Sequence, residues 1–154
     1  MKRTVVSSLC AIAAGFVFIL SVGLANVEAQ MPGSPLRARI PFEFNVRGKT
    51  LPAGDYEIKR VYDTPDILMI AEVGRNESDH AIFNTEPVQP RKAPNRTELI
   101  FHRYGDSYFL SEILTGYDNT GRELLPSREE KVLKREMISR GDKAEPQVVA
   151  VAIY

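Results

Sequence analysis

The residues most able to do chemistry in this chain are few, and their spacing forms no familiar site. The chain has two histidines, His80 and His102, and one cysteine, Cys10. A structural zinc site usually needs four His or Cys ligands, and a catalytic zinc site needs three protein ligands. Two histidines with an acidic neighbour such as Asp79 or Glu112 would form a minimal set, but no HxH or HxxxH spacing supports it. We therefore expect no metal site.

Motifs for nucleophilic catalysis and phosphate binding are also missing from the sequence. No serine lies in a GxSxG elbow, and there is no glycine-rich phosphate-binding loop. The carboxylates are scattered, although acid/base partners can meet in space without being close in sequence. We expect no catalytic residues, no cofactor and no cofactor-binding residues.

One polar-aromatic cluster is expected at the tip of a hairpin. It consists of Arg103, Tyr104, Asp106 and Tyr108. Arg and Tyr are favoured at binding hot spots, so these four residues form a possible recognition patch. The structural alternative is that they satisfy one another in an Arg–Asp–Tyr network.

Residues 1–29 have the composition of a cleavable signal peptide. Lys2 and Arg3 precede an uncharged, largely apolar stretch at 5–24, and small residues around Ala29 provide a cleavage site. An uncleaved membrane anchor is the alternative, since about 20 apolar residues can span a bilayer. We expect an exported protein, periplasmic or extracellular after cleavage near Ala29, that meets the membrane only through its export signal.

The charge balance and the cysteine content limit which compartment and which partners we expect. The chain has 20 basic and 20 acidic residues, and this balance gives no electrostatic reason to expect a nucleic acid or an anionic membrane as a partner. The cysteine lies within the expected signal peptide, so the exported part holds no disulfide, which fits a bacterial envelope better than a eukaryotic extracellular space. An unknown protein, a polymer and a small apolar ligand remain as partners, and the oligomeric state is not predicted.

The rest of the sequence predicts one β-rich domain. Residues 30–36 are expected to form a flexible leader, and residues 37–154 a single domain. Alternation at 40–46 predicts a half-buried strand that is an edge strand or begins at a bulge, and the apolar run 148–154 predicts a central strand that closes against it. With about seven or eight strands at this spacing, the fold class is all-β, either a barrel or a two-sheet sandwich.

A hairpin is the clearest local prediction. Gly105-Asp106 lies between two apolar segments and suits a two-residue type II′ turn. This turn sets Phe101 opposite Leu110 on one face. It sets Ile100 opposite Ser111 on the other face.

A single helix is predicted at about 127–140, near the C-terminus. Ser127 is a good N-cap, and Glu130 three residues later completes a capping box. The apolar stripe of this helix is expected to pack on the sheet. Upstream, Gly54-Asp55-Tyr56 is similar to the tyrosine corner of β-sandwiches, in which a Tyr near a strand start ties down the preceding turn.

Three stretches together resemble a known group of proteins. They are IPFEF at 40–44 leading to GKTLPAGDY at 48–56, FHRYGDSYFL at 101–110, and GREL at 121–124. In this order, and over most of the exported part, they resemble small exported proteins of acidobacterial-type soil bacteria that carry no assigned activity. The resemblance implies a shared fold, and it implies no substrate, cofactor or catalytic residue.

Three functions are compatible with these observations. We favour an exported, non-enzymatic envelope or secreted binding module, or a structural module, of unknown ligand. The alternative is a carrier with an apolar barrel cavity, which would need about 300 Å³ of interior space. The third hypothesis is a hydrolase that uses the scattered carboxylates.

Overall fold

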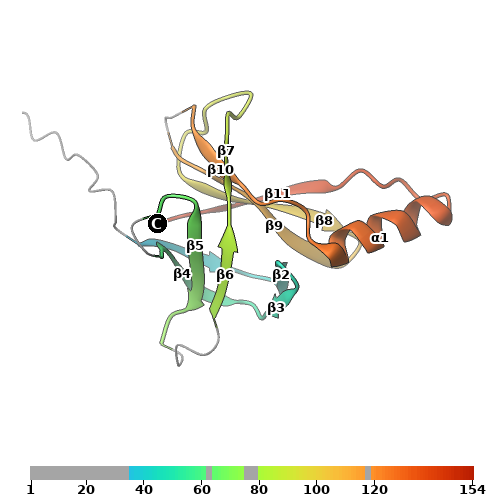
Figure 1. Ribbon diagram of the computed structural model, residues 1–154, viewed down its shortest axis with the longest axis horizontal. Coiled ribbons are helices and arrows are strands. Elements are labelled where there is room, and N and C mark those ends of the chain that lie inside the picture. The colour runs from blue at the N-terminus through green and yellow to red at the C-terminus, as the bar shows by residue number, and fades with distance from the viewer. Residues whose placement is uncertain (1–34, 62–63, 75–79, 117–118) are drawn as a thin grey trace, which may run out of the picture. The chain divides into compact units, whose positions relative to one another are not determined.

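The computed structural model describes residues 35–61, 64–74, 80–116 and 119–154, and this part of the chain contains eleven strands and one helix (Figure 1). Their bounds are β1 (Leu36–Ile40), β2 (Phe44–Val46), β3 (Lys49–Leu51), β4 (Gly54–Arg60), β5 (Ile67–Glu72), β6 (His80–Asn84), β7 (Glu86–Val88), β8 (Glu98–Tyr104), β9 (Ser107–Leu114), β10 (Gly121–Glu123), α1 (Arg128–Ser139) and β11 (Gln147–Ala152).

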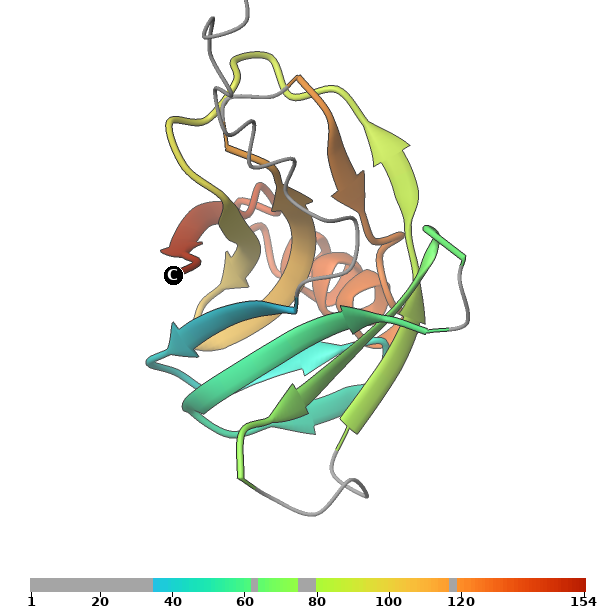
Figure 2. The same cartoon turned by 90° about the vertical axis from the view of Figure 1, so that its left-hand side faces the viewer.

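The strands form two sheets. The four-stranded sheet has the order β1-β4-β5-β6, and the seven-stranded sheet has the order β11-β8-β9-β10-β7, with β2 joined to β9 and β3 joined to β2. Figure 2 shows the four-stranded sheet in blue and green in front of the yellow and brown strands of the other sheet. The all-β prediction is confirmed, and of its two alternatives the sandwich is the one that the separate sheets match.

The estimate of about seven or eight strands is too low, because four of the eleven strands are only three residues long and give little periodic signal in the sequence. One of them, β7, contains Pro87. β7 is an edge strand, and an edge strand tolerates a residue that donates no ladder hydrogen bond. The predicted strand at 40–46 is likewise divided, because β1 ends at Ile40 before Pro41.

The two sheets meet where the chain turns from β6 into β7. Thr85 stands between these strands and is buried, and its backbone N–H and its hydroxyl both donate to the carbonyl of Asp66, at 2.8 and 3.1 Å. On the other side, Ile153 forms a bridge with Ala38, and the N–H of Tyr154 donates to the carbonyl of β1 at residue 37, at 2.9 Å. The sheets therefore keep a fixed spacing around one shared interior.

Aromatic rings fill the middle of that interior. The ring of Phe44 meets the rings of Tyr56 and Phe101 edge-on, with centroids 5.1 and 5.4 Å apart, and all three side chains are fully buried. The hydroxyl of Tyr56 donates to the carbonyl of Pro52 at 2.8 Å, which confirms the predicted tyrosine corner. Further apolar side chains complete the core: Ala38, Ile40, Val46, Leu51, Ile58, Leu68, Ile70, Ala81, Phe83, Leu99, Leu110, Ile113 and Leu124.

The prediction that 148–154 forms a central strand is wrong. β11 is the edge of the seven-stranded sheet and pairs along its length with β8 alone. Val149 and Val151 pack against the core, whereas Val148 is 66% exposed. An apolar run can occupy a sheet edge when every second side chain points to the core. Of the side chains on the other face of this run, two belong to small alanines.

The expected signal peptide at 1–29 lies outside the described residues, as does most of the expected leader at 30–36, and Leu36 already belongs to β1. Helix α1 falls within the predicted range 127–140. No helix among the described residues has both the length and the hydropathy needed to cross a membrane.

Candidate functional site

The β8–β9 hairpin forms as predicted over the four residue pairs next to its turn. Gly105 has a φ of 59°, which a type II′ turn requires at its first central position, and Phe101 lies opposite Leu110. The register then shifts, so that Ile100 lies opposite Glu112 and not opposite Ser111 as predicted. The cause is a β-bulge with Ser111 as the extra residue, and bulges commonly change the direction of a side chain next to a functional site.

The tip of this hairpin holds three residues of the predicted recognition patch. The Nε of Arg103 donates to the carbonyl of Gly105 at 2.7 Å, and a second guanidinium nitrogen lies 3.9 Å from a carboxylate oxygen of Asp106. The guanidinium also lies 5.4 Å from the ring centroid of Tyr108, which stacks on Phe42 at 4.0 Å. Arg103 and Tyr108 thus find most of their polar and ring contacts within the hairpin tip and with Phe42.

The fourth member of the patch, Tyr104, does not share this surface. Its side chain is only 5% exposed, and its hydroxyl donates at 3.2 Å to Oε1 of Glu130, in the first turn of α1. The structure thus separates Tyr104 from Arg103, Asp106 and Tyr108 and places it in a different cluster.

This second cluster, which we call the buried polar cluster, consists of His102, Tyr104, Ser111 and Glu130. Nδ1 of His102 lies 3.1 Å from Oε1 of Glu130, and Nε2 lies 3.1 Å from Oγ of Ser111. A carboxylate only accepts hydrogen bonds, so the neutral tautomer of His102 that fits these contacts has its proton on Nδ1 and accepts the Ser111 hydroxyl at Nε2. Sequence reasoning missed this cluster because its members come from β8, β9 and α1.

Glu130 also joins the first turn of α1 to the sheet through its bonds to His102 and Tyr104. It is 6% exposed and is the only buried residue of the helix, whereas Val132 and Ile138 are 40% and 59% exposed. The predicted packing of the apolar stripe on the sheet is therefore wrong for these two side chains, because α1 leads away from the strands after its first turn (Figure 1). The capping box is half formed: Ser127 accepts the N–H of Glu130 at 3.2 Å, but the Glu130 carboxylate turns to the sheet.

Burial and neighbouring charges shift the pKa values of two residues in this region. Burial, followed by the charge and the hydrogen bond of Glu130, raises the pKa of Tyr104 from 10.0 to about 12. Burial and the charge of Glu123, which lies opposite on β10, raise the pKa of Glu112, while His102 acts in the other direction. Both shifts favour the uncharged form in the folded protein.

A groove with a volume of about 480 Å³ opens beside the start of α1. We call it the basic groove; its lining residues are Arg47, Pro126, Ser127, Arg128, Glu129, Lys131 and Arg135. The pKa of Glu129 is lowered by a hydrogen bond with its own backbone N–H, then by Ser127 and by the charge of Arg128. Glu129 is thus engaged at the helix cap, and among the described residues none of the four cationic side chains forms a salt bridge.

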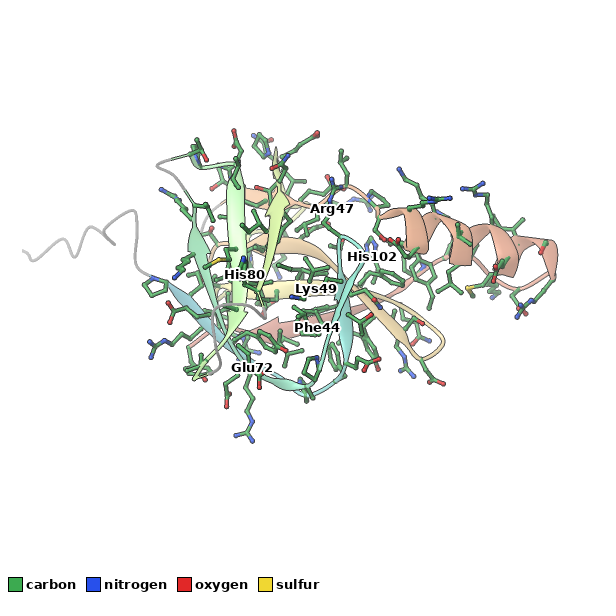
Figure 3. The ribbon with its side chains drawn as sticks, turned by 60° about the horizontal axis from the view of Figure 1, so that its bottom comes forward. Phe44, Arg47, Lys49, Glu72, His80 and His102 are labelled. Atoms are coloured by element: carbon green, nitrogen blue, oxygen red, sulfur yellow. The ribbon has the colours of Figure 1, made fainter. Side chains whose placement is uncertain are left out.

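Arg47 reaches this groove from a strained backbone position. It occupies the first central position of the two-residue turn between β2 and β3, with a φ of 50°, and Gly48 follows with a φ of 88°. Asn, Asp or Gly are favoured at that position, and another residue costs about 1 kcal/mol there. Figure 3 shows Arg47 and His102 beside the start of α1, and a guanidinium nitrogen of Arg47 donates to the carbonyl of Leu125 at 3.5 Å.

The other histidine lies elsewhere. His80 is on β6 in the four-stranded sheet, where its carbonyl accepts a hydrogen bond from Nζ of Lys49 at 3.0 Å (Figure 3). In the part of the chain that the structure describes, no three His, Cys, Asp or Glu side chains converge as metal ligands.

Comparison of the chain with models of protein families, with curated proteins and with solved structures gives no match. The resemblance to small exported proteins of soil bacteria stays a prediction. The residues of the described domain therefore carry the functional argument by themselves.

The raised pKa of Tyr104 predicts a pH dependence of stability. Below pH 10 the neutral phenol gives its full contribution to the folded state; as the pH rises from 10.0 to about 12, Tyr104 ionises first in the unfolded chain and this contribution is lost. We expect the free energy of unfolding of Tyr104→Phe to fall less steeply than that of the wild type above pH 10. Urea titrations between pH 8 and 11.5 measure this difference, and parallel curves would contradict the assignment.

Proposed function

We propose that the protein is an exported binding module that binds a linear acidic polysaccharide through the basic groove. The observation that carries this proposal is the convergence of four cationic side chains on one groove, from a hairpin turn and from a helix, without a carboxylate partner among the described residues. Export itself rests on the composition of residues 1–29.

The cations of the helix are arranged as a row. Arg128, Lys131 and Arg135 stand at positions i, i+3 and i+7 of α1, so they share one side of the helix over about 10 Å. A polymer with a carboxylate or sulfate on successive sugars presents anions in a comparable row. Each contact is weak in water, and several contacts along one chain add up.

The positive charge is concentrated at the basic groove, while the chain as a whole carries balanced charge. The chain has equal numbers of basic and acidic residues, so long-range attraction of a highly charged nucleic acid gains little. A short row of cations attracts an anionic ligand locally, at the groove. The proposal therefore keeps the expectation that nucleic acid is not the partner.

The packing of the interior favours a surface function over the carrier hypothesis. Phe44, Tyr56 and Phe101 meet in the middle of the space between the sheets. A carrier would need about 300 Å³ of free interior volume, and the rings occupy the position where an apolar ligand would lie.

A pair of charge-matched variants tests the basic groove. Arg128→Ala/Lys131→Ala/Arg135→Ala removes the row, and Lys134→Ala/Arg140→Ala/Lys143→Ala removes the same charge from exposed positions outside the groove. With about 0.5 kcal/mol for each exposed contact, we expect the first variant to lose roughly tenfold in affinity. Calorimetric titration with polygalacturonate and with dextran sulfate measures the affinities.

The same titration defines the contradicting results. Uncharged dextran should not bind, and added salt should weaken the binding of the acidic polymers. Equal losses of affinity in the two triple variants would show that only net charge matters, and tight binding of uncharged dextran would exclude charge recognition.

Arg47 gives a separate prediction in which stability and binding change in opposite directions. Arg47→Asn relieves the left-handed backbone conformation, so we expect the free energy of unfolding to rise by about 0.5 to 1 kcal/mol. The same substitution removes one cation from the groove and should weaken polygalacturonate binding. Urea denaturation and calorimetry on one preparation measure both effects, and a destabilised variant would show that Arg47 serves the fold.

A further inference from the structure

We infer that Ser111, His102 and Glu130 form a second site, separate from the basic groove, in which Ser111 accepts short acyl groups from esters. The three side chains stand in line: Ser111 Oγ lies 3.1 Å from Nε2 of His102, and Nδ1 of the same ring lies 3.1 Å from Oε1 of Glu130. A hydroxyl, an imidazole and a carboxylate in this order form the constellation that activates serine nucleophiles.

The partners of His102 fix the tautomer that this chemistry needs. Glu130 accepts a hydrogen bond from Nδ1–H of the neutral tautomer, and in that tautomer the lone pair of Nε2 is directed at the hydroxyl of Ser111. Tyr104 donates to the same carboxylate oxygen at 3.2 Å and so holds Glu130 in place. When Nε2 takes the serine proton, the imidazolium lies beside Glu130 and within the field of Glu112.

The position of Ser111 restricts the substrate. Ser111 is the bulged residue of β9, and its hydroxyl lies on the same face of the sheet as His102. Ser111 is 5% exposed and the His102 side chain is 26% exposed, so a large acyl group has no access. Val148 lies opposite His102 on the neighbouring strand and is 66% exposed, and it offers an apolar surface beside the ring. An uncharged ester with an acyl group of acetyl size fits these limits.

The reaction balances without a metal or a cofactor. Oγ of Ser111 bonds to the ester carbonyl carbon while its proton passes to Nε2 of His102. The bond from that carbon to the alcohol oxygen then breaks, and the proton on Nε2 transfers to the leaving alcohol. A water molecule repeats the two steps on the acyl-serine, which releases the carboxylic acid and restores the Ser111 hydroxyl.

The test uses p-nitrophenyl acetate on the full exported chain, with release of p-nitrophenol and mass spectrometry of the peptides as readouts. We expect a burst of product and an acetyl group on Ser111, both lost in Ser111→Ala and kept in Ser107→Ala, a matched change on the same strand. Glu130→Gln, in which the positioning carboxylate is lost, should slow acetylation by at least about 100-fold. Acetylation that persists in Ser111→Ala, or that falls equally on Ser107, would overturn the inference.

A cysteine variant separates activation from folding defects. In Ser111→Cys the thiol faces Nε2 of His102, so ion-pair formation should make it react with iodoacetamide at pH 6.5 at least about tenfold faster than the thiol of Ser107→Cys. Adding Glu130→Gln should remove this advantage. Equal alkylation rates in the two single variants would show that His102 does not activate position 111.

Discussion

The buried carboxylate of Glu130 is the contact on which the functional face of this protein depends. Burying a carboxylate is costly unless its oxygens accept hydrogen bonds, and here Tyr104 and His102 supply the donors. A twelve-residue helix is marginal in water by itself, and α1 has little apolar contact with the sheet. The helix is therefore located by directional polar bonds at its first turn, and its remaining turns extend from that point.

This anchor builds both candidate sites. It sets the cationic row of α1 beside the strained turn at Arg47, and it completes the line from Ser111 through His102. The two faces of the seven-stranded sheet carry different kinds of side chain. The inner face contributes aromatic and aliphatic side chains to the core, while the outer face carries the buried polar cluster under the start of α1. Most apolar burial lies between the two sheets. The outer face of the seven-stranded sheet can therefore carry polar groups without interrupting the apolar core.

Local pattern was sufficient for the fold class, the helix range, the hairpin turn and the tyrosine corner, because each depends on residues close in sequence. The partner of Glu130 could not be predicted, since a carboxylate three residues after an N-cap has an equally good local partner in the capping box. The bulge at Ser111 was also hidden, because alternation continues on both sides of it. The edge position of β11 depends on which strands pair, and strand order is not encoded locally. The spacing of Arg128, Lys131 and Arg135 was visible, but its convergence with Arg47 required the tertiary structure.

The central claim is that Glu130 holds α1 on the sheet, and amide hydrogen exchange of Glu130→Ala against Glu136→Ala tests it most directly. Both variants replace a glutamate of α1 with alanine, but Glu136 is exposed, and its carboxylate contacts Arg140 on the same helix at 3.9 Å. We predict that protection of Arg128–Ser139 falls at least about tenfold in Glu130→Ala, the loss expected for a charged hydrogen bond, and stays unchanged in Glu136→Ala. Protection in β4 should be the same in both. Unchanged helix protection in Glu130→Ala would contradict the account.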